Sequence, residues 1–317
     1  MGLVLYIIGG VGPAFMNSIS SILGLRAILG LSIGLVTPLM AAIIAENFKG
    51  NERSRMNGLT TSANGIGGAV FLLIGGTIAS LGWRGVFLTY SYGIILLILV
   101  LLYVPKIKPD HGNKTNERSK VVKLPVKVYM LGLASTGVMI LYYAIPTNLA
   151  IFIVDNGLGD ASTVGYVTAL SFFGVFLAGI SVTRLLSILK KAVVPCILLI
   201  FGLSFLLLSQ AHSIWLVAIS VFMMGSGFGF VYPILLNKMA EAAPIGRMTA
   251  AVSLLSAFAN LGQFISPLVI HGIQAIFHLN SIRNVFMIIA VHLGGSTVTL
   301  LCLSISGKKR VLINRKV

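Results

Sequence analysis

Charged residues are scarce in this sequence, and acidic residues are the scarcest. Only 9% of the 317 residues are charged, whereas a soluble domain has about 25%. Hydrophobic residues make up 57% of the chain. Because so few charges cannot cover a water-exposed surface of this size, the composition excludes a soluble globular protein.

The sequence also lacks the residue clusters that catalysis or metal binding would require. Its two cysteines, Cys196 and Cys302, lie far apart inside apolar segments, which is typical of small core residues and not of a disulfide or a metal pair. No His, Asp, Glu or nucleophilic Ser cluster occurs at membrane depth, and no G-x-x-x-x-G-K-[ST] motif for ATP is present. We therefore expect no enzyme activity, no catalytic residue, no metal and no cofactor.

What the sequence has in abundance is long apolar segments. A helix needs about 20 such residues to cross ~30 Å of hydrocarbon. The first segment lacks the positive charge and cleavage site of a signal peptide, so we expect it to be retained. We predict an all-α integral membrane protein with ten transmembrane helices, at 1–17, 22–46, 54–81, 84–104, 127–154, 161–187, 192–209, 213–240, 247–277 and 281–305.

A long polar interval divides these helices into four and six. It is rich in cations, with Pro, Gly and Asn, and it predicts a cytoplasmic linker between two bundles. The predicted domains are a partial N-terminal bundle at 1–104, the linker at 105–126, a six-helix bundle at 127–306 and a basic tail at 307–317.

The positions of the cations predict the orientation. If the N-terminus is cytoplasmic, twenty of the 23 Lys and Arg residues lie on the cytoplasmic side, and only Arg26, Arg84 and Arg283 do not. We therefore expect a multi-pass protein of a bacterial-type cytoplasmic membrane with both termini inside. The net charge of +16 then reflects this bias and not nucleic-acid binding.

An internal repeat favours a transporter. Three pairs of matching positions recur in the same order: Gly30, Gly34 and Pro38 with Gly225, Gly229 and Pro233; Ala63-Asn64 with Ala259-Asn260; and Arg84-Gly85-Val86-Phe87 with Arg283-Asn284-Val285-Phe286. Two related bundles around a central path are the basis of alternating access. Because equivalent halves should have equal helix numbers, we expect that two helices are missing before residue 1.

Several motifs resemble the major facilitator superfamily, particularly its bacterial drug:proton antiporters. They are LGLRAILGLSIG from Leu23, ENFKGNERSRMNGL from Glu46, GWRGVFLTY from Gly82 and the long segment GSGFGFVYPILLNKMAEAAPIGRMTAAVSLLSAFANLGQFISPLV. The resemblance implies a major-facilitator-like fold with a truncated first bundle, and it places Arg26 near the substrate or proton path. The sequence departs from the pattern at Leu29, where Gln is usual, and at Phe71-Leu72, where Gly-Pro is expected.

Polar residues inside apolar helices are the candidates for this path. Pro146 predicts a break that frees backbone carbonyls near Tyr142, Tyr143 and Asn148, and this cluster is our first candidate for substrate contact. Asn260 and Gln263 are further candidates, with interhelical hydrogen bonding as the alternative. His271 and His292 are candidates for proton coupling, with a satisfied core histidine as the alternative. All seven acidic residues lie in loops or at helix ends, so either the coupling group was on the missing helices or coupling is absent.

Four charged residues at the inner helix ends predict a cytoplasmic gate. Glu46 and Arg53, with Glu241 and Arg247, could form ion pairs that break when the bundles rock apart, and the alternative is ordinary solvated loop charges. In that hypothesis, Glu241→Gln slows transport without affecting folding.

The sequence therefore predicts a secondary transporter that exports amphipathic compounds or metabolites in exchange for protons. Its partners would be a small-molecule substrate, protons and the lipid bilayer, and we expect a monomer. Two alternatives stay open: a uniporter or importer of a small organic anion with Arg26 as the counter-charge, or a truncated transporter without activity.

Overall fold

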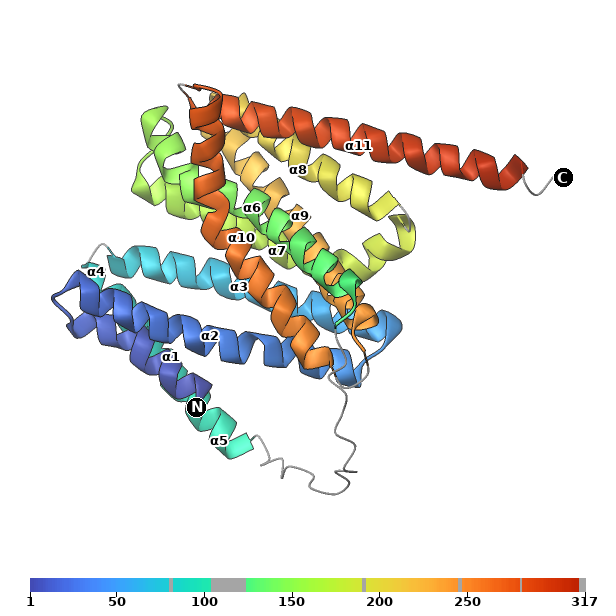
Figure 1. Cartoon of the computed structure of the whole chain (residues 1–317). Coiled ribbons are helices and arrows are strands. Elements are labelled where there is room, and N and C mark those ends of the chain that lie inside the picture. Colours follow the sequence, from blue (N-terminus) through green and yellow to red (C-terminus); the bar gives the residue numbers. More distant parts are fainter. Residues whose placement is uncertain (80–81, 104–123, 190–191, 245–246, 280, 314–317) are drawn as a thin grey trace, which may run out of the picture.

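All regular structure in the described part of the chain is helical. The computed structural model describes residues 1–79, 82–103, 124–189, 192–244, 247–279 and 281–313. The elements are α1 (Gly2–Val11), the 3₁₀ helix η1 (Gly12–Phe15), α2 (Ile19–Asn47), α3 (Gly50–Ala79), α4 (Trp83–Leu88), the 3₁₀ helix η2 (Thr89–Ser91), α5 (Tyr92–Tyr103), α6 (Val126–Asp155), α7 (Ala161–Leu189), α8 (Val193–Ser209), α9 (Ile214–Ala242), α10 (Met248–Ile276) and α11 (Ile282–Ile313) (Figure 1).

Eight of the described helical segments are long and apolar enough to cross a membrane, and α4 with α5 counts as one of them. Two shorter apolar segments, Gly2–Phe15 and Val193–Ser209, correspond to the other two predicted spans. The all-helical multi-pass character is thus confirmed, whereas the count of ten is not. The predicted linker is described only from residue 124 and the predicted tail only to residue 313, so the division into four and six helices stays a prediction.

Pro146 does not break its helix, and that prediction is wrong. α6 continues from Val126 to Asp155 with the proline inside it. Proline removes the hydrogen bond to the carbonyl four residues before it, which is that of Tyr142, and its ring crowds this carbonyl. The side chains just after it bond the next two carbonyls: Thr147 Oγ1 donates to Tyr143 O (2.6 Å) and Asn148 Nδ2 to Ala144 O (2.8 Å). In a membrane, where water is absent, a continuous helix leaves the fewest polar groups unpaired.

α7 is packed between α3 and α9, and glycines allow both contacts. On the α3 side, Gly58 lies against Gly179, and Gly65 lies against the backbone of Phe172 and Phe176. Ser62 Oγ also donates to Phe176 O across this contact (2.9 Å). On the α9 side, Gly225 and Gly229 lie against the backbone of α7. Residues before and after the linker are therefore joined through α7.

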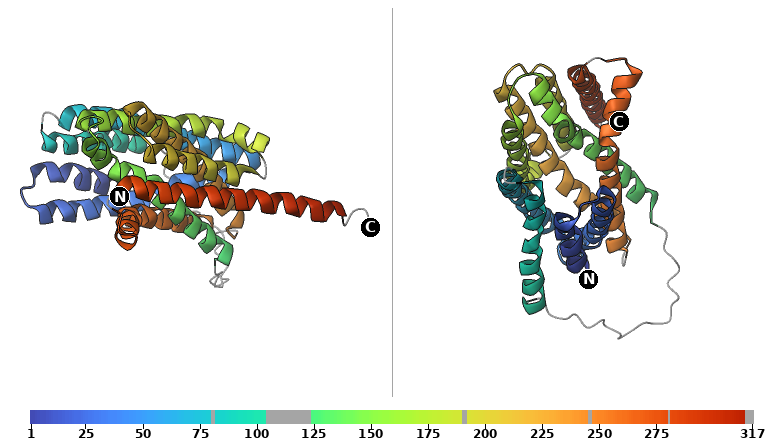
Figure 2. Two further views of the ribbon diagram at one scale, coloured as in Figure 1. Left: turned by 90° about the horizontal axis from the view of Figure 1, so that it is seen from above. Right: turned by 90° about the vertical axis from the view of Figure 1, so that its left-hand side faces the viewer.

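The first and second groups of helices meet along α3 and α7, and α2 approaches α10 near the end where α2 finishes and α3 begins, which we call the joined end. Here Ala41 of α2 packs against a buried cluster that includes Val128, Leu235 and Val252. In Figure 1, α2 and α10 are close at this end and then run apart. α11 extends beyond the other helices at its C-terminal end (Figure 2).

Candidate functional site

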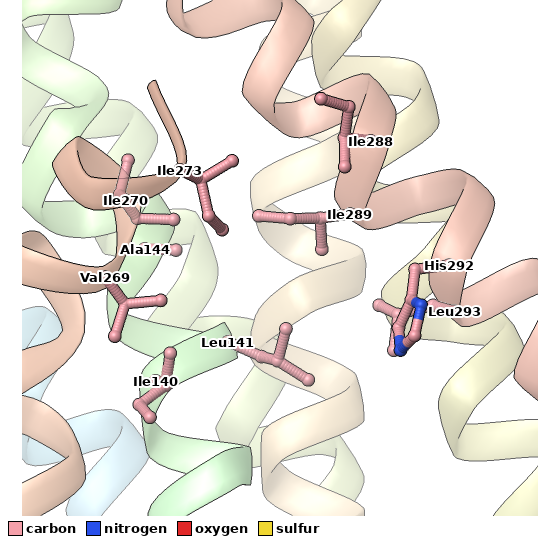
Figure 3. A pocket seen from close by; sticks show the side chains of 10 residues that line it. All are labelled: Ile140, Leu141, Ala144, Val269, Ile270, Ile273, Ile288, Ile289, His292 and Leu293. Carbon is pink, nitrogen blue, oxygen red and sulfur yellow. The ribbon is translucent and has the colours of Figure 1, made fainter. Parts of the chain in front are cut away.

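Two cavities lie about one helical turn apart along α6, and residues of α6, α10 and α11 line both of them; we refer to this stretch as the groove along α6. The first, of about 250 Å³, is shown in Figure 3. Its walls are apolar apart from one histidine, and they are formed by Ile140, Leu141, Ala144, Val269, Ile270, Ile273, Ile288, Ile289, His292 and Leu293. In Figure 3 the α11 side chains Ile288, Ile289 and His292 lie across the cavity from those of α6 and α10.

The second cavity is polar and lies toward the C-terminal end of α6. It has a volume of about 420 Å³ and is lined by Asn148, Ile151, Phe152, Asp155, Asn156, His271, Gln274, Ser281 and Ile282. Ala144 of the first cavity and Asn148 of the second are about one helical turn apart on α6, so the two cavities are consecutive. The groove therefore changes along its length from apolar to polar, and each part has one histidine in its wall.

The predicted cluster around Pro146 is divided between the core and this groove. Asn148 lines the polar cavity, as predicted for a substrate contact, although its amide nitrogen already donates to Ala144 O and Thr147 Oγ1. Tyr142 is buried instead: its ring stacks on Phe228 of α9 with centroids 4.2 Å apart, and its hydroxyl lies 3.4 Å from that of Ser171. Tyr143 is half-buried beside Tyr142. Whether these residues contact a substrate stays a prediction.

The other two amides proposed for the path lie elsewhere on α10. Asn260 and Gln263 are not covered by the described part of the chain, and neither lines the two cavities. They can therefore face lipid, a central path or another segment, and their assignment also stays a prediction.

Arg26 of α2 is half-buried between aromatic rings. Its guanidinium carbon lies 4.7 Å from the ring centre of Phe87 and 5.3 Å from that of Tyr90, and Nη1 donates to Tyr90 Oη (3.3 Å). The negative faces of the rings offset part of the desolvation of the cation. No described carboxylate pairs with Arg26.

The four predicted gate residues are brought to the joined end, but no ion pair connects them within the described ranges. Arg53 donates from Nε to Phe48 O (2.8 Å) and from Nη2 to Ala45 O (3.2 Å), so it caps the end of α2. Glu46 accepts a hydrogen bond from Thr249 Oγ1 of α10 (3.4 Å). Glu241 lies in the wall of a third cavity, and Arg247 lies just before α10. Their role in gating stays a prediction.

Two polar contacts near the helix ends were not predicted from the sequence. At the joined end, Asn57 Nδ2 of α3 donates to Asn237 Oδ1 of α9 (2.9 Å). At the opposite end, Arg283 donates to Asn156 Oδ1 from Nε (3.0 Å) and Nη2 (2.8 Å), and to Ser209 O from Nη1 (3.2 Å). The repeated Arg-x-Val-Phe motif pointed to Arg283, whereas Asn57 carried no comparable signal.

Comparison with known proteins agrees with this architecture. The sequence model of the Major Facilitator Superfamily matches residues 1–186 and 131–314. The chain is 25% identical to the quinolone resistance protein NorA of Staphylococcus aureus (strain MSSA476) over 321 aligned positions, which cover 95% of this chain and 78% of NorA.

Two solved structures show a similar fold. The human organic anion transporter MFSD10 (TETRAN) aligns with a TM-score of 0.74 at 17% identity, covering 94% of this chain and 76% of MFSD10. The proton:xylose symporter XylE aligns with a TM-score of 0.66 at 15% identity, covering 95% of this chain and 78% of XylE. At these identities, the likeness concerns the fold alone.

Proposed function

Because this chain belongs to the Major Facilitator Superfamily, and is therefore a membrane transporter and not an enzyme, we propose that it exports amphipathic compounds in exchange for protons. The observation that carries the proposal is the groove along α6, in which an apolar cavity of about 250 Å³ is followed by a polar one of about 420 Å³. A substrate with an apolar body and a polar end matches such a groove, because its apolar part can contact the apolar wall and its polar part the polar wall. The similarity to NorA supports export of this kind.

The proposed coupling groups are His292 and His271, one in each cavity. A proton-coupled carrier needs a side chain that can gain and lose a proton along its path, and an imidazole is such a side chain. Asp155 also lines the polar cavity, at the last residue of α6, and supplies a carboxylate to the same cavity as His271. A proton taken up at this end could pass into the groove as the substrate leaves.

Alternating access is the proposed mechanism, and the joined end supplies one of its two gates. If the cationic residues face the cytoplasm, the joined end is the cytoplasmic side, and the structure represents a state closed there. Glu46 with Thr249, and Asn57 with Asn237, would separate when the helix groups rock apart. Arg53, Glu241 and Arg247 lie around these contacts and complete the proposed gate.

Arg26 favours a second candidate, the transport of a small organic anion. Its guanidinium has no carboxylate partner in the described residues and is held by Phe87 and Tyr90, so an anionic substrate could supply the counter-charge. MFSD10 is itself an organic anion transporter, although its likeness to this chain is one of fold.

The two candidates are separated by transport in proteoliposomes that contain the purified protein. A cationic amphipathic dye and an aromatic carboxylate are compared, each with and without an uncoupler. Export of amphipaths predicts uncoupler-sensitive dye transport, and carboxylate transport alone would overturn it. Loss of both activities would indicate that this chain does not transport by itself.

Histidine variants test the proposed coupling in the same vesicles. We expect His292→Gln and His271→Gln to abolish uphill transport driven by a pH gradient, but to keep substrate exchange, because only the proton step is removed. His212→Gln, which changes an exposed histidine outside both cavities, is the matched control. Full uphill transport in both cavity variants would contradict the assignment.

A further inference from the structure

A third cavity lies at the joined end, between the two groups of helices. It has a volume of about 290 Å³, room for several water molecules or one tetrahedral oxyanion. Its walls come from the start of α3, from α7 and from α9, and they are formed by Gly50, Asn51, Arg53, Ser54, Leu186, Ile234, Asn237, Lys238 and Glu241. We propose that this cavity binds a phosphate group.

The Ser54 hydroxyl is the first observation that points to a ligand. Ser54 is only 5% exposed, it lies in the cavity wall, and its Oγ has no hydrogen-bond partner. Buried polar atoms in native proteins are nearly always paired, so each exception needs an explanation. A phosphate oxygen in the cavity would accept the hydrogen bond that Ser54 otherwise lacks.

The start of α3 supplies further donors at the same place. The first amides of a helix have no partner within the helix, and no described hydrogen bond uses those of Gly50, Asn51 or Glu52. The dipole of this 30-residue helix also favours a negative charge at its N-terminus. The helix start therefore favours an anion, and the Ser54 hydroxyl beside it can donate a hydrogen bond to one.

The cavity wall contains two cationic residues and one carboxylate, so its charge favours an anion. Lys238 and Arg53 are cations that form no described ion pair, and Arg53 keeps Nη1 free while Nε and Nη2 hold the end of α2. Glu241 opposes them, because its carboxylate would repel the anion. The wall therefore suits a phosphate group, which accepts hydrogen bonds from guanidinium, ammonium, hydroxyl and amide donors together.

Phosphate at the joined end could come from a phospholipid headgroup or from the solution, and the chemistry of recognition is the same. The bound group would contact both α3 and α9 next to the Asn57–Asn237 hydrogen bond, so it would hold the joined end together. Phosphate binding itself does not depend on the proposed export. Any effect of the bound phosphate on transport does rest on that proposed function.

The test measures the thermal unfolding of the full chain in detergent. One arm titrates inorganic phosphate against chloride at equal ionic strength, and the other compares phosphatidylglycerol with diacylglycerol, which has the same tails but no phosphate group. We expect the melting temperature to rise with phosphate, with phosphatidylglycerol or with both. A rise with the lipid alone assigns the site to a headgroup, and a rise with both assigns it to phosphate groups in general. No rise in either arm would overturn the proposal.

Variants separate a binding site from general charge effects. Lys238→Gln should weaken binding roughly tenfold, the loss of one charge-assisted hydrogen bond, and Glu241→Gln should strengthen it. Ser54→Ala should raise the melting temperature without ligand, since it removes an unpartnered buried hydroxyl, and yet reduce the shift that the ligand causes. Arg55→Gln, an exposed neighbouring cation outside the cavity, is the control. Wild-type shifts in both Ser54→Ala and Lys238→Gln would overturn the site.

Discussion

Three arginines lie away from the basic joined end, and each is covered by an aromatic ring. Arg26 lies over Phe87 and Tyr90, Arg84 lies 5.1 Å from the ring centre of Trp83, and Arg283 lies 4.8 Å from that of Phe152. These are the three cations that do not lie on the cytoplasmic side if the N-terminus is cytoplasmic. A cation near hydrocarbon loses hydration, and the ring faces restore part of the lost interaction.

Arg283 should contribute more to stability than its repeat equivalent Arg84. We expect Arg283→Gln to lower the free energy of unfolding by about 1–3 kcal/mol, because it removes three charge-assisted hydrogen bonds that tie α11 to the ends of α6 and α8. Denaturant unfolding of the detergent-solubilised protein measures the change.

Arg84→Gln is the matched control for that experiment. Arg84 is exposed and donates one hydrogen bond, from Nη2 to Asn17 Oδ1 (2.6 Å), so its loss should be less than about 1 kcal/mol. Equal losses in the two variants would show that the additional contacts of Arg283 contribute nothing.

The repeated Gly-x-x-x-Gly motifs behave differently in the two helices that contain them. On α9, a methyl group at Gly225 would overlap the Ser171 carbonyl oxygen, and one at Gly229 would lie 2.7 Å from Val175 O. On α2, nothing lies within 4 Å of a methyl group at Gly30 or Gly34. The sequence predicts the same close packing for both pairs, but only the α9 pair has a described helix against it.

Alanine substitution should therefore have opposite effects on the two helices. Gly225→Ala should destabilise the protein by about 1–3 kcal/mol, since α7 and α9 must move apart. Gly30→Ala should be neutral or stabilising by up to ~1 kcal/mol, because alanine is the better helix former. The melting temperatures of the two variants in the same detergent give the comparison, and a destabilised Gly30→Ala would mean that α2 has a close partner.

In the molecule as a whole, the two groups of helices are in contact along α3 and α7 and, at the joined end, through α2 and α10. The described hydrogen bonds between residues 1–103 and residues 124–313 are those of Asn57 with Asn237, Ser62 with Phe176 and Glu46 with Thr249. All involve the last turn of α2 or the first half of α3. A transporter that alternates between two states must separate at least part of this contact.

Covalent closure of the joined end should stop transport. Cysteines at positions 57 and 237, in a chain with Cys196→Ala and Cys302→Ala, can be joined by a short bifunctional maleimide because the native side chains are in hydrogen-bond contact. We expect the cross-linked protein to bind substrate but not to transport it. The same variant treated with a monofunctional maleimide should transport, and full activity after cross-linking would exclude rocking at this contact.

The sequence by itself determined which segments are helical membrane segments. All ten apolar segments coincide with helical structure, and eight of these helical segments are long enough to span a membrane, although α11 runs to Ile313 and not to residue 305. The reason is that burial in lipid depends on local composition and leaves helix as the only way to pair the backbone. The basic segments and the repeat were also readable along the chain, and the repeat marked the position of Arg283 but not its contacts. The continuity of α6 through Pro146 could not be read from the sequence, because whether a helix continues through a proline depends on which groups pair the nearby carbonyls.

Only the tertiary structure decided which side of each helix faces what. Tyr142 is in the core and Asn148 is in a cavity, although they lie six residues apart on α6 in equally apolar surroundings. Gly30 and Gly225 likewise differ in their packing although they belong to the same repeated motif. Only the tertiary structure shows that the Ser54 hydroxyl lacks a hydrogen-bond partner in the wall of the third cavity, which Lys238 also lines. The physical reason is that lipid tails and protein neighbours are alike apolar, so a membrane helix carries no polarity pattern that separates its packed side from its lipid side.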